Sequence, residues 1–128
     1  VYSVDQSAPR KAAIAEQLIS RSISTRKGVI SYQVIQEFFN VAIKRFSALM
    51  SIADSEQYLN QTFLPLFCVQ SSATLYRESL RLYATGSFSW YDSLIVSAAL
   101  QAKCGILYTE DLQHGQKIGS LQIANPFL

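Results

Sequence analysis

Residues 89–115 read SWYDSLIVSAALQAKCGILYTEDLQHG, and this stretch decides the fold class. Ser89 is a good helix N-cap, and the apolar residues after it recur at helical spacing as far as Lys103. Gly105 is expected to close this helix, and Ile106–Thr109 (ILYT) is typical of a short buried strand. A helix that leads directly into a strand indicates a layered α/β arrangement.

Helices and strands alternate in the same way along the rest of the chain. Further helices are expected over residues 8–20, over 32–45 with Ser31 as cap, from Asp54 or Ser55 to near Pro65, and over 73–85 between Ser72 and Gly86; short strands are expected over 28–31, 67–70 and 121–125. Val1–Val4 (VYSV) reads as the tail of a strand. The alternation predicts one α/β domain with a mainly parallel sheet, and such sheets bind ligands at the carboxyl ends of their strands.

The composition excludes several classes of protein. An apolar fraction of 49% supports a hydrophobic core and is too high for a disordered chain. No apolar run approaches about 18 residues, so neither a membrane span nor contact with a membrane is expected, and no signal peptide is visible. Cys68 and Cys104 lack metal-ligand spacing, and we expect them unbonded in the reducing cytoplasm. His114 lies in a glycine-flanked turn and is expected at the surface without a nucleophile partner.

The charge pattern is weakly informative about nucleic-acid binding. A net charge of +2 is too small to argue for it alone. Basic residues do occur in adjacent pairs, at Arg10/Lys11, Arg26/Lys27 and Lys44/Arg45. These pairs either contact phosphates or form ordinary solvated surface.

One acidic residue interrupts the apolar stripe of the helix over 32–45. Glu37 lies three residues after Val34 and four before Val41, so it falls on their face. A buried carboxylate is costly unless it has a partner or binds a metal. The alternatives are a buried salt bridge or a stripe edge that faces water.

Two further acids stand at positions suited to chemistry. Asp92 shares a face with Ile95, Val96 and Ala99, although Ser89-x-x-Asp92 also reads as a capping box, and the two roles can coexist. Asp111 follows the expected strand over 106–109 and is alternatively an ordinary turn residue. Three acids from three segments that meet at one sheet edge would suit a hard divalent cation such as Mg²⁺.

The sequence around these acids resembles the PIN-domain nucleases. ISYQVIQEFFNVAIKR (30–45) resembles their second acidic motif, 89–115 resembles the third and fourth, and IANPF (123–127) is similar to the closing segment of VapC-type toxins. The resemblance covers almost the whole chain. It implies a three-layer α/β/α sandwich with a mainly parallel central sheet. It also implies Glu37, Asp92 and Asp111 as catalytic ligands of Mg²⁺ or Mn²⁺, with the hydroxyl of Thr109 in support.

The resemblance further implies a function and partners. The activity would be hydrolysis of RNA phosphodiester bonds by the toxin of a bacterial toxin–antitoxin pair, with the metal activating a water. A small antitoxin would neutralise the toxin and place a basic side chain near the acids. A homodimer is also expected, with the apolar residues Phe39, Phe46, Tyr58 and Phe63 as interface candidates.

One departure from the family leaves a second function open. The family's first motif, a central strand that ends in Asp-Thr-Asn, would precede Val1, so we expect the sequence to lack its N-terminal strand; Asp5 is placed in the following loop. Without that acid the chain could instead be a non-catalytic PIN-like binding module. A receiver-type signalling domain is the least favoured reading, because FCVQSS (67–72) lacks the aspartate expected after its middle strand.

Overall fold

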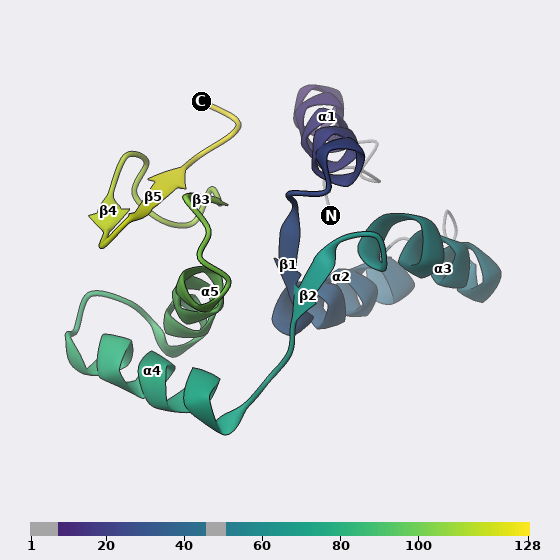
Figure 1. Cartoon of the computed structure of the whole chain (residues 1–128). Helices are drawn as coiled ribbons and strands as arrows, with labels where there is room; N and C mark the ends of the chain where they lie inside the picture. Colours follow the sequence, from purple (N-terminus) through teal and green to yellow (C-terminus); the bar gives the residue numbers. More distant parts are fainter. Residues whose placement is uncertain (1–7, 46–50) are drawn as a thin grey trace. The chain divides into compact units, whose positions relative to one another are not determined.

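The structure is a computed structural model that describes residues 8–45 and 51–128. The strand predicted at Val1–Val4, the loop position of Asp5 and the dimer candidate Phe46 lie outside the described residues. The fold is mixed α/β with 57% helix. The chain divides after Cys68 into two compact units, each of which is described here by itself (Figure 1).

The first unit consists mainly of helices. Its elements are α1 (Pro9–Thr25), β1 (Val29–Ser31), α2 (Tyr32–Arg45), α3 (Ile52–Tyr58), the π-helical segment η2 (Leu59–Phe63) and β2 (Phe67–Val69), whose last residue crosses the unit boundary. β1 and β2 form a two-stranded parallel sheet.

Two helix boundaries of this unit differ from prediction. α1 continues past Ser20 to Thr25, where hydroxyls such as that of Ser22 donate to carbonyls of the preceding turn, and it ends where Arg26 adopts φ 56°. α3 begins at Ile52 because Ser51 is the cap: its Oγ accepts from the Asp54 amide, and the Asp54 carboxylate accepts from the Ser51 amide. This reciprocal pair is a capping box, so Asp54 is inside the helix and does not start it.

Aromatic rings form the core of the first unit. Phe38 stacks on Tyr58 with ring centroids 4.9 Å apart and meets Phe63 edge-on at 5.1 Å. Such pairs stabilise by about 0.5–1.5 kcal/mol beyond the burial of their area. Phe63 is only 6% exposed, and Phe39 and Tyr58 pack against the same cluster. These three dimer candidates therefore stabilise the unit itself, and Phe63 presents no exposed face to a partner.

The second unit has two helices against a small sheet. Its elements are α4 (Ala73–Ala84), α5 (Trp90–Gln101), β3 (Ile106–Tyr108), β4 (Lys117–Ile118) and β5 (Leu121–Ala124), with sheet order β3-β5-β4. Val96 and Ala99 of α5 pack with Leu121 and Ile123 of β5, all of them buried. None of the helices in the described ranges is long and apolar enough to span a bilayer.

The predicted caps are largely confirmed. The hydroxyls of Ser31, Ser72 and Ser89 accept amide hydrogens at the starts of α2, α4 and α5. Gly86 follows α4 at φ 77°, as expected for a glycine after a helix. The predicted end of α5 is wrong: α5 stops at Gln101, and the residue with positive φ is Lys103 (58°), not Gly105.

The sheet of the second unit contains a strand that the sequence did not suggest. β3 pairs parallel with β5, with Tyr108 opposite Ala124; the sequence had not indicated which strands pair. β4 pairs antiparallel with β5, with Ile118 opposite Leu121. Gly119 at φ 59° forms the two-residue turn between them, which requires positive φ. A two-residue strand has no alternation to detect, which is why the pattern missed it.

Candidate functional site

Glu37 lies on α2 of the first unit and is exposed. α2 buries Phe38 and Ala42, whereas Val34 is 38% exposed. Of the alternatives that the sequence left open, the structure therefore shows a stripe edge that faces water. The buried stripe is rotated by one residue, because the aromatic core of the unit packs against Phe38, and Glu37 stands at the water-facing edge of the stripe.

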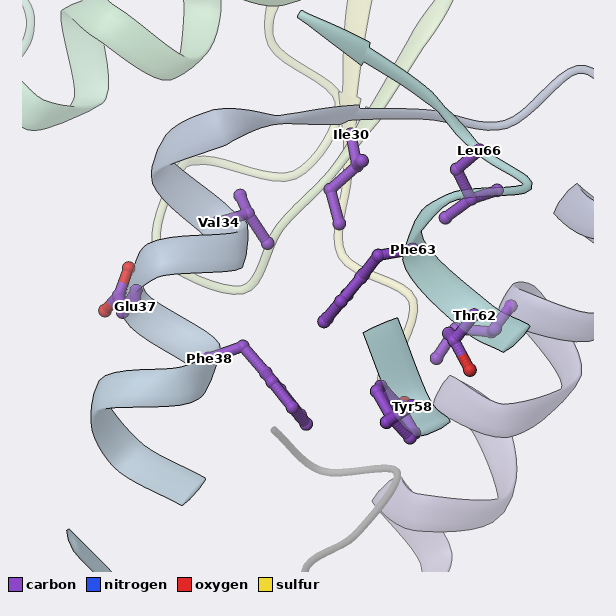
Figure 2. A pocket seen from close by; sticks show the side chains of 9 residues that line it. Ile30, Val34, Glu37, Phe38, Tyr58, Thr62, Phe63 and Leu66 are labelled. Carbon is purple, nitrogen blue, oxygen red and sulfur yellow. The ribbon is translucent and has the colours of Figure 1, made fainter. Parts of the chain in front are cut away.

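An apolar cavity of about 250 Å³ lies beside Glu37 (Figure 2). Its walls come from α1, β1, α2, α3 and η2, and the lining residues are Ile19, Ile30, Val34, Glu37, Phe38, Tyr58, Thr62, Phe63 and Leu66. Figure 2 shows the Glu37 carboxylate pointing outward from α2, away from Phe63. The interior of the cavity is thus almost wholly apolar, and the carboxylate stays available at its rim.

Asp92 lies in the first turn of α5 and is half-buried. Its backbone N–H donates to Ser89 Oγ at 3.1 Å, so the predicted cap exists. In contrast with Asp54, the Asp92 carboxylate makes no return bond to the amide of its cap within the described residues. Only half of the predicted capping box is formed, and the carboxylate remains free for another ligand.

Asp111 lies three residues after the end of β3, in the turn where it was predicted, and its backbone is held by Thr109. The Thr109 amide continues the β3–β5 ladder by donating to the Ala124 carbonyl at 3.0 Å. The Thr109 hydroxyl then accepts from the Asp111 amide at 3.1 Å. The hydroxyl therefore shapes the turn that presents the exposed Asp111 carboxylate at the carboxyl end of the strand.

Two polar residues near Asp111 were not predicted to interact. The Asn125 amide, just past β5, donates to His114 Nδ1 at 3.0 Å, and Asn125 Oδ1 accepts from the Phe127 amide at 2.9 Å. His114 is exposed, as expected for a surface turn. The Asn125–Pro126 dipeptide marks a turn in the sequence, but nothing there indicates its histidine partner.

The three acids do not all fall in one unit. Asp92 and Asp111 belong to the second unit and Glu37 to the first. Within residues 8–45 and 51–128, no three histidine, cysteine or acidic side chains form a group that could hold a metal. The convergence of all three carboxylates stays a prediction.

The two cysteines do not contribute a nucleophile to a site. Cys68 and Cys104 form no disulfide, as predicted, and both are half-buried. Desolvation by burial raises the pKa of each thiol. A raised pKa disfavours the reactive thiolate, so these residues act as small packing side chains.

Comparison with protein families and with curated proteins gives no relative from which to transfer a function. No protein family matches this chain, and no curated protein matches it. Any function must therefore be supported by the residues of the chain itself.

Proposed function

We propose that this protein is a metal-dependent ribonuclease of PIN type, a cytoplasmic toxin of a bacterial toxin–antitoxin pair. The observation that carries the proposal is the pair of acids in the second unit. The carboxylate of Asp92 is half-buried at the start of α5 and is not used in its capping box. Asp111 is fixed by Thr109 at the carboxyl end of a parallel strand, where α/β sheets bind ligands.

The lengths of α5 and β3 favour positions of Asp92 and Asp111 at the same height along the strand direction of the sheet. α5 packs on β3 and β5, and only residues 102–105 connect it to β3, so the helix would run back along the strand. From Asp92 to Gln101 the helix rises about 14 Å, at about 1.5 Å per residue. From Ile106 to Thr109, where the turn begins, the chain advances about 10 Å, at about 3.3 Å per residue, and the turn then carries Asp111. Both acids therefore lie toward the carboxyl end of β3, which supports a common site at that edge.

Glu37 is the proposed third acid. α2 follows β1 without a loop, and Glu37 stands in its second turn, so it too lies shortly after the carboxyl end of a parallel strand. In a three-layer α/β/α sandwich with a mainly parallel central sheet, all three acids would share one edge. Like charges brought close together repel unless a cation neutralises them, and carboxylate oxygens suit Mg²⁺ or Mn²⁺.

The proposed reaction is hydrolysis of an RNA phosphodiester. The oxygen of a water forms a bond to phosphorus, the bond from phosphorus to the leaving ribose oxygen breaks, and the proton lost by the water ends on that leaving oxygen. A bound cation would polarise the phosphate and lower the pKa of the attacking water. The three carboxylates would hold the cation. Exposed basic residues such as Arg26 and Lys27 would hold the RNA backbone.

An antitoxin is the proposed partner of the first unit. The apolar cavity offers a place for an aliphatic or aromatic anchor of such a protein. The outward carboxylate of Glu37 at the cavity rim favours a basic residue beside that anchor. A homodimer remains part of the proposal, with contacts other than the buried Phe63.

The test is RNA cleavage by the full chain with Mg²⁺, with Mn²⁺ and with a chelator. Cleavage should require the metal, and Asp92→Asn should lower it by at least 100-fold. Mg²⁺ should also raise the melting temperature of the wild type and not that of the variant, because a ligand stabilises the state that binds it.

The matched control is Asp54→Asn. Asp54 occupies the same third helical position in α3, where its carboxylate serves only the cap. This variant should keep full cleavage and the full shift with Mg²⁺. Metal binding without cleavage would instead identify a non-catalytic binding module, and no effect of Asp92→Asn on cleavage would contradict the proposed site.

A further inference from the structure

Two hydrogen bonds attach the turn that carries His114 to the end of β5. The Asn125 amide donates to Nδ1 of His114, and the next residue, Gly115, donates its own amide to the Ile123 carbonyl at 2.8 Å. Gly115 has φ 84°, which a residue with a side chain rarely adopts. The backbone and one ring nitrogen are therefore held by the sheet.

This contact fixes which ring nitrogen carries the proton. A nitrogen that accepts a hydrogen bond has no hydrogen of its own, so the neutral imidazole carries its proton on Nε2. His114 is exposed, and its Nε2–H has no hydrogen-bonding partner within the described residues. The ring thus presents one oriented donor to solvent.

The position of this donor links it to Asp111. β3 and β5 are adjacent and parallel, so their carboxyl ends lie at one edge. Asp111 follows β3 three residues before His114, and Asn125 follows β5. The Nε2–H of His114 and the carboxylate of Asp111 therefore belong to the same loop, at the same edge of the sheet. A donor fixed before the ligand arrives costs little ordering entropy on binding.

We propose that His114 contacts a backbone phosphate of the RNA, with its Nε2–H donating to a non-bridging phosphate oxygen next to the phosphate bound at Asp111. This inference rests on the proposed ribonuclease function and adds a substrate-contacting residue to it. The contact is a single hydrogen bond from a ring whose orientation the Asn125 amide already sets.

Two substitutions at His114 separate the proposed RNA contact of Nε2 from the hydrogen bond that Nδ1 accepts from the Asn125 amide. Asparagine places Oδ1 where Nδ1 stands, so His114→Asn keeps an acceptor for the Asn125 amide and loses the distal donor. Glutamine places Nε2 at the distal position, so His114→Gln keeps a donor and loses the clamp acceptor. His114→Asn should therefore weaken RNA binding with little loss of stability, whereas His114→Gln should lower the melting temperature more than the RNA affinity.

The experiment measures binding of a short fluorescent single-stranded oligoribonucleotide to the full chain, with Ca²⁺ in place of Mg²⁺. His114→Asn should raise the Kd roughly tenfold, the effect of one hydrogen bond to a charged group. His114→Gln should stay within about threefold. Because His114 is the single histidine of the chain, its imidazole nitrogen resonances are unambiguous. The Nε2 resonance should shift when the oligonucleotide is added.

The outcomes separate this inference from the function on which it rests. If the wild type binds and cleaves RNA while His114→Asn binds equally well and the Nε2 resonance does not move, His114 is only a loop clamp and the inference is wrong. If the wild type binds no RNA at all, the ribonuclease proposal and the inference both fail. If His114→Asn loses binding because it unfolds, His114→Gln provides the check. The part of the His114→Gln protein that is folded must then still bind RNA.

Discussion

The hydroxyl of Thr109 accepts the backbone N–H of Asp111 at 3.1 Å, so a residue at the end of β3 sets the direction of the acid that follows it. Thr109→Val keeps the shape of the side chain and removes this bond. We expect a loss of about 1 kcal/mol of unfolding free energy, and RNA cleavage lowered on the order of tenfold because the acid is less well positioned. Thr109→Ser, which keeps the hydroxyl, should retain most of both.

The control for this prediction is Thr85→Val. The Thr85 hydroxyl likewise accepts the amide two residues later, that of Ser87, at 3.4 Å, and it also donates to the Leu82 carbonyl at 2.6 Å, at the end of α4. This variant should lower the unfolding free energy about as much as Thr109→Val and leave cleavage intact. Equal cleavage by Thr109→Val and Thr85→Val would contradict a role of the Thr109 hydroxyl in the site.

Gly28 should tolerate no side chain. A Cβ built there would lie 2.5 Å from Ser22 Cβ and 2.6 Å from Leu66 Cδ2, so α1 or the segment before β2 must shift. Gly28→Ala should lower the unfolding free energy by about 1–3 kcal/mol, the usual effect of overpacking. Thermal and urea denaturation measure it. Gly105→Ala is the control, because a Cβ there meets nothing within 4 Å, and it should be neutral or slightly stabilising.

Stability should fall as the pH rises through the alkaline range. Burial raises the pKa of Cys68 and Cys104 in the folded chain above the pKa in the unfolded chain. Between these two pKa values the unfolded state has lost more protons, so the thiol contribution is complete below the unfolded pKa and is lost as pH rises through the folded pKa. Denaturant midpoints from pH 7 to 10 should decline less in Cys68→Ala/Cys104→Ala. Identical declines in both proteins would refute this.

Local features of the fold could be predicted from the sequence. The caps at Ser31, Ser72 and Ser89 were correct because each hydroxyl bonds an amide only three residues away. The strands at Ile106–Tyr108 and Leu121–Ala124 were predicted from their short β-prone runs, although their pairing was not. The positions of Asp92 and Asp111 at the start of a helix and the end of a strand were predicted for the same local reason.

Features that depend on distant residues could not be predicted. The sequence could not decide whether Glu37 is buried or faces water, because the pattern of α2 allows two neighbouring stripes, and the rings of Tyr58 and Phe63 select the one that contains Phe38. The start of α3 was misplaced for a local reason, since Ser51 and Asp54 both resemble caps and the reciprocal bonds decide between them.

The sequence by itself determined the class of fold, the order of helices and strands and the residues that begin most helices, because these depend on spacing and on bonds within one turn. The tertiary structure alone decided that Glu37 faces water, that Lys117–Ile118 pairs with Leu121–Ala124, and that His114 bonds to Asn125 eleven residues away. The first and the last need a partner brought from elsewhere in the chain, and the hairpin depends on the packing of Leu121 in the core. The free energy of such a contact appears only when packing holds both partners together, so no local pattern encodes it.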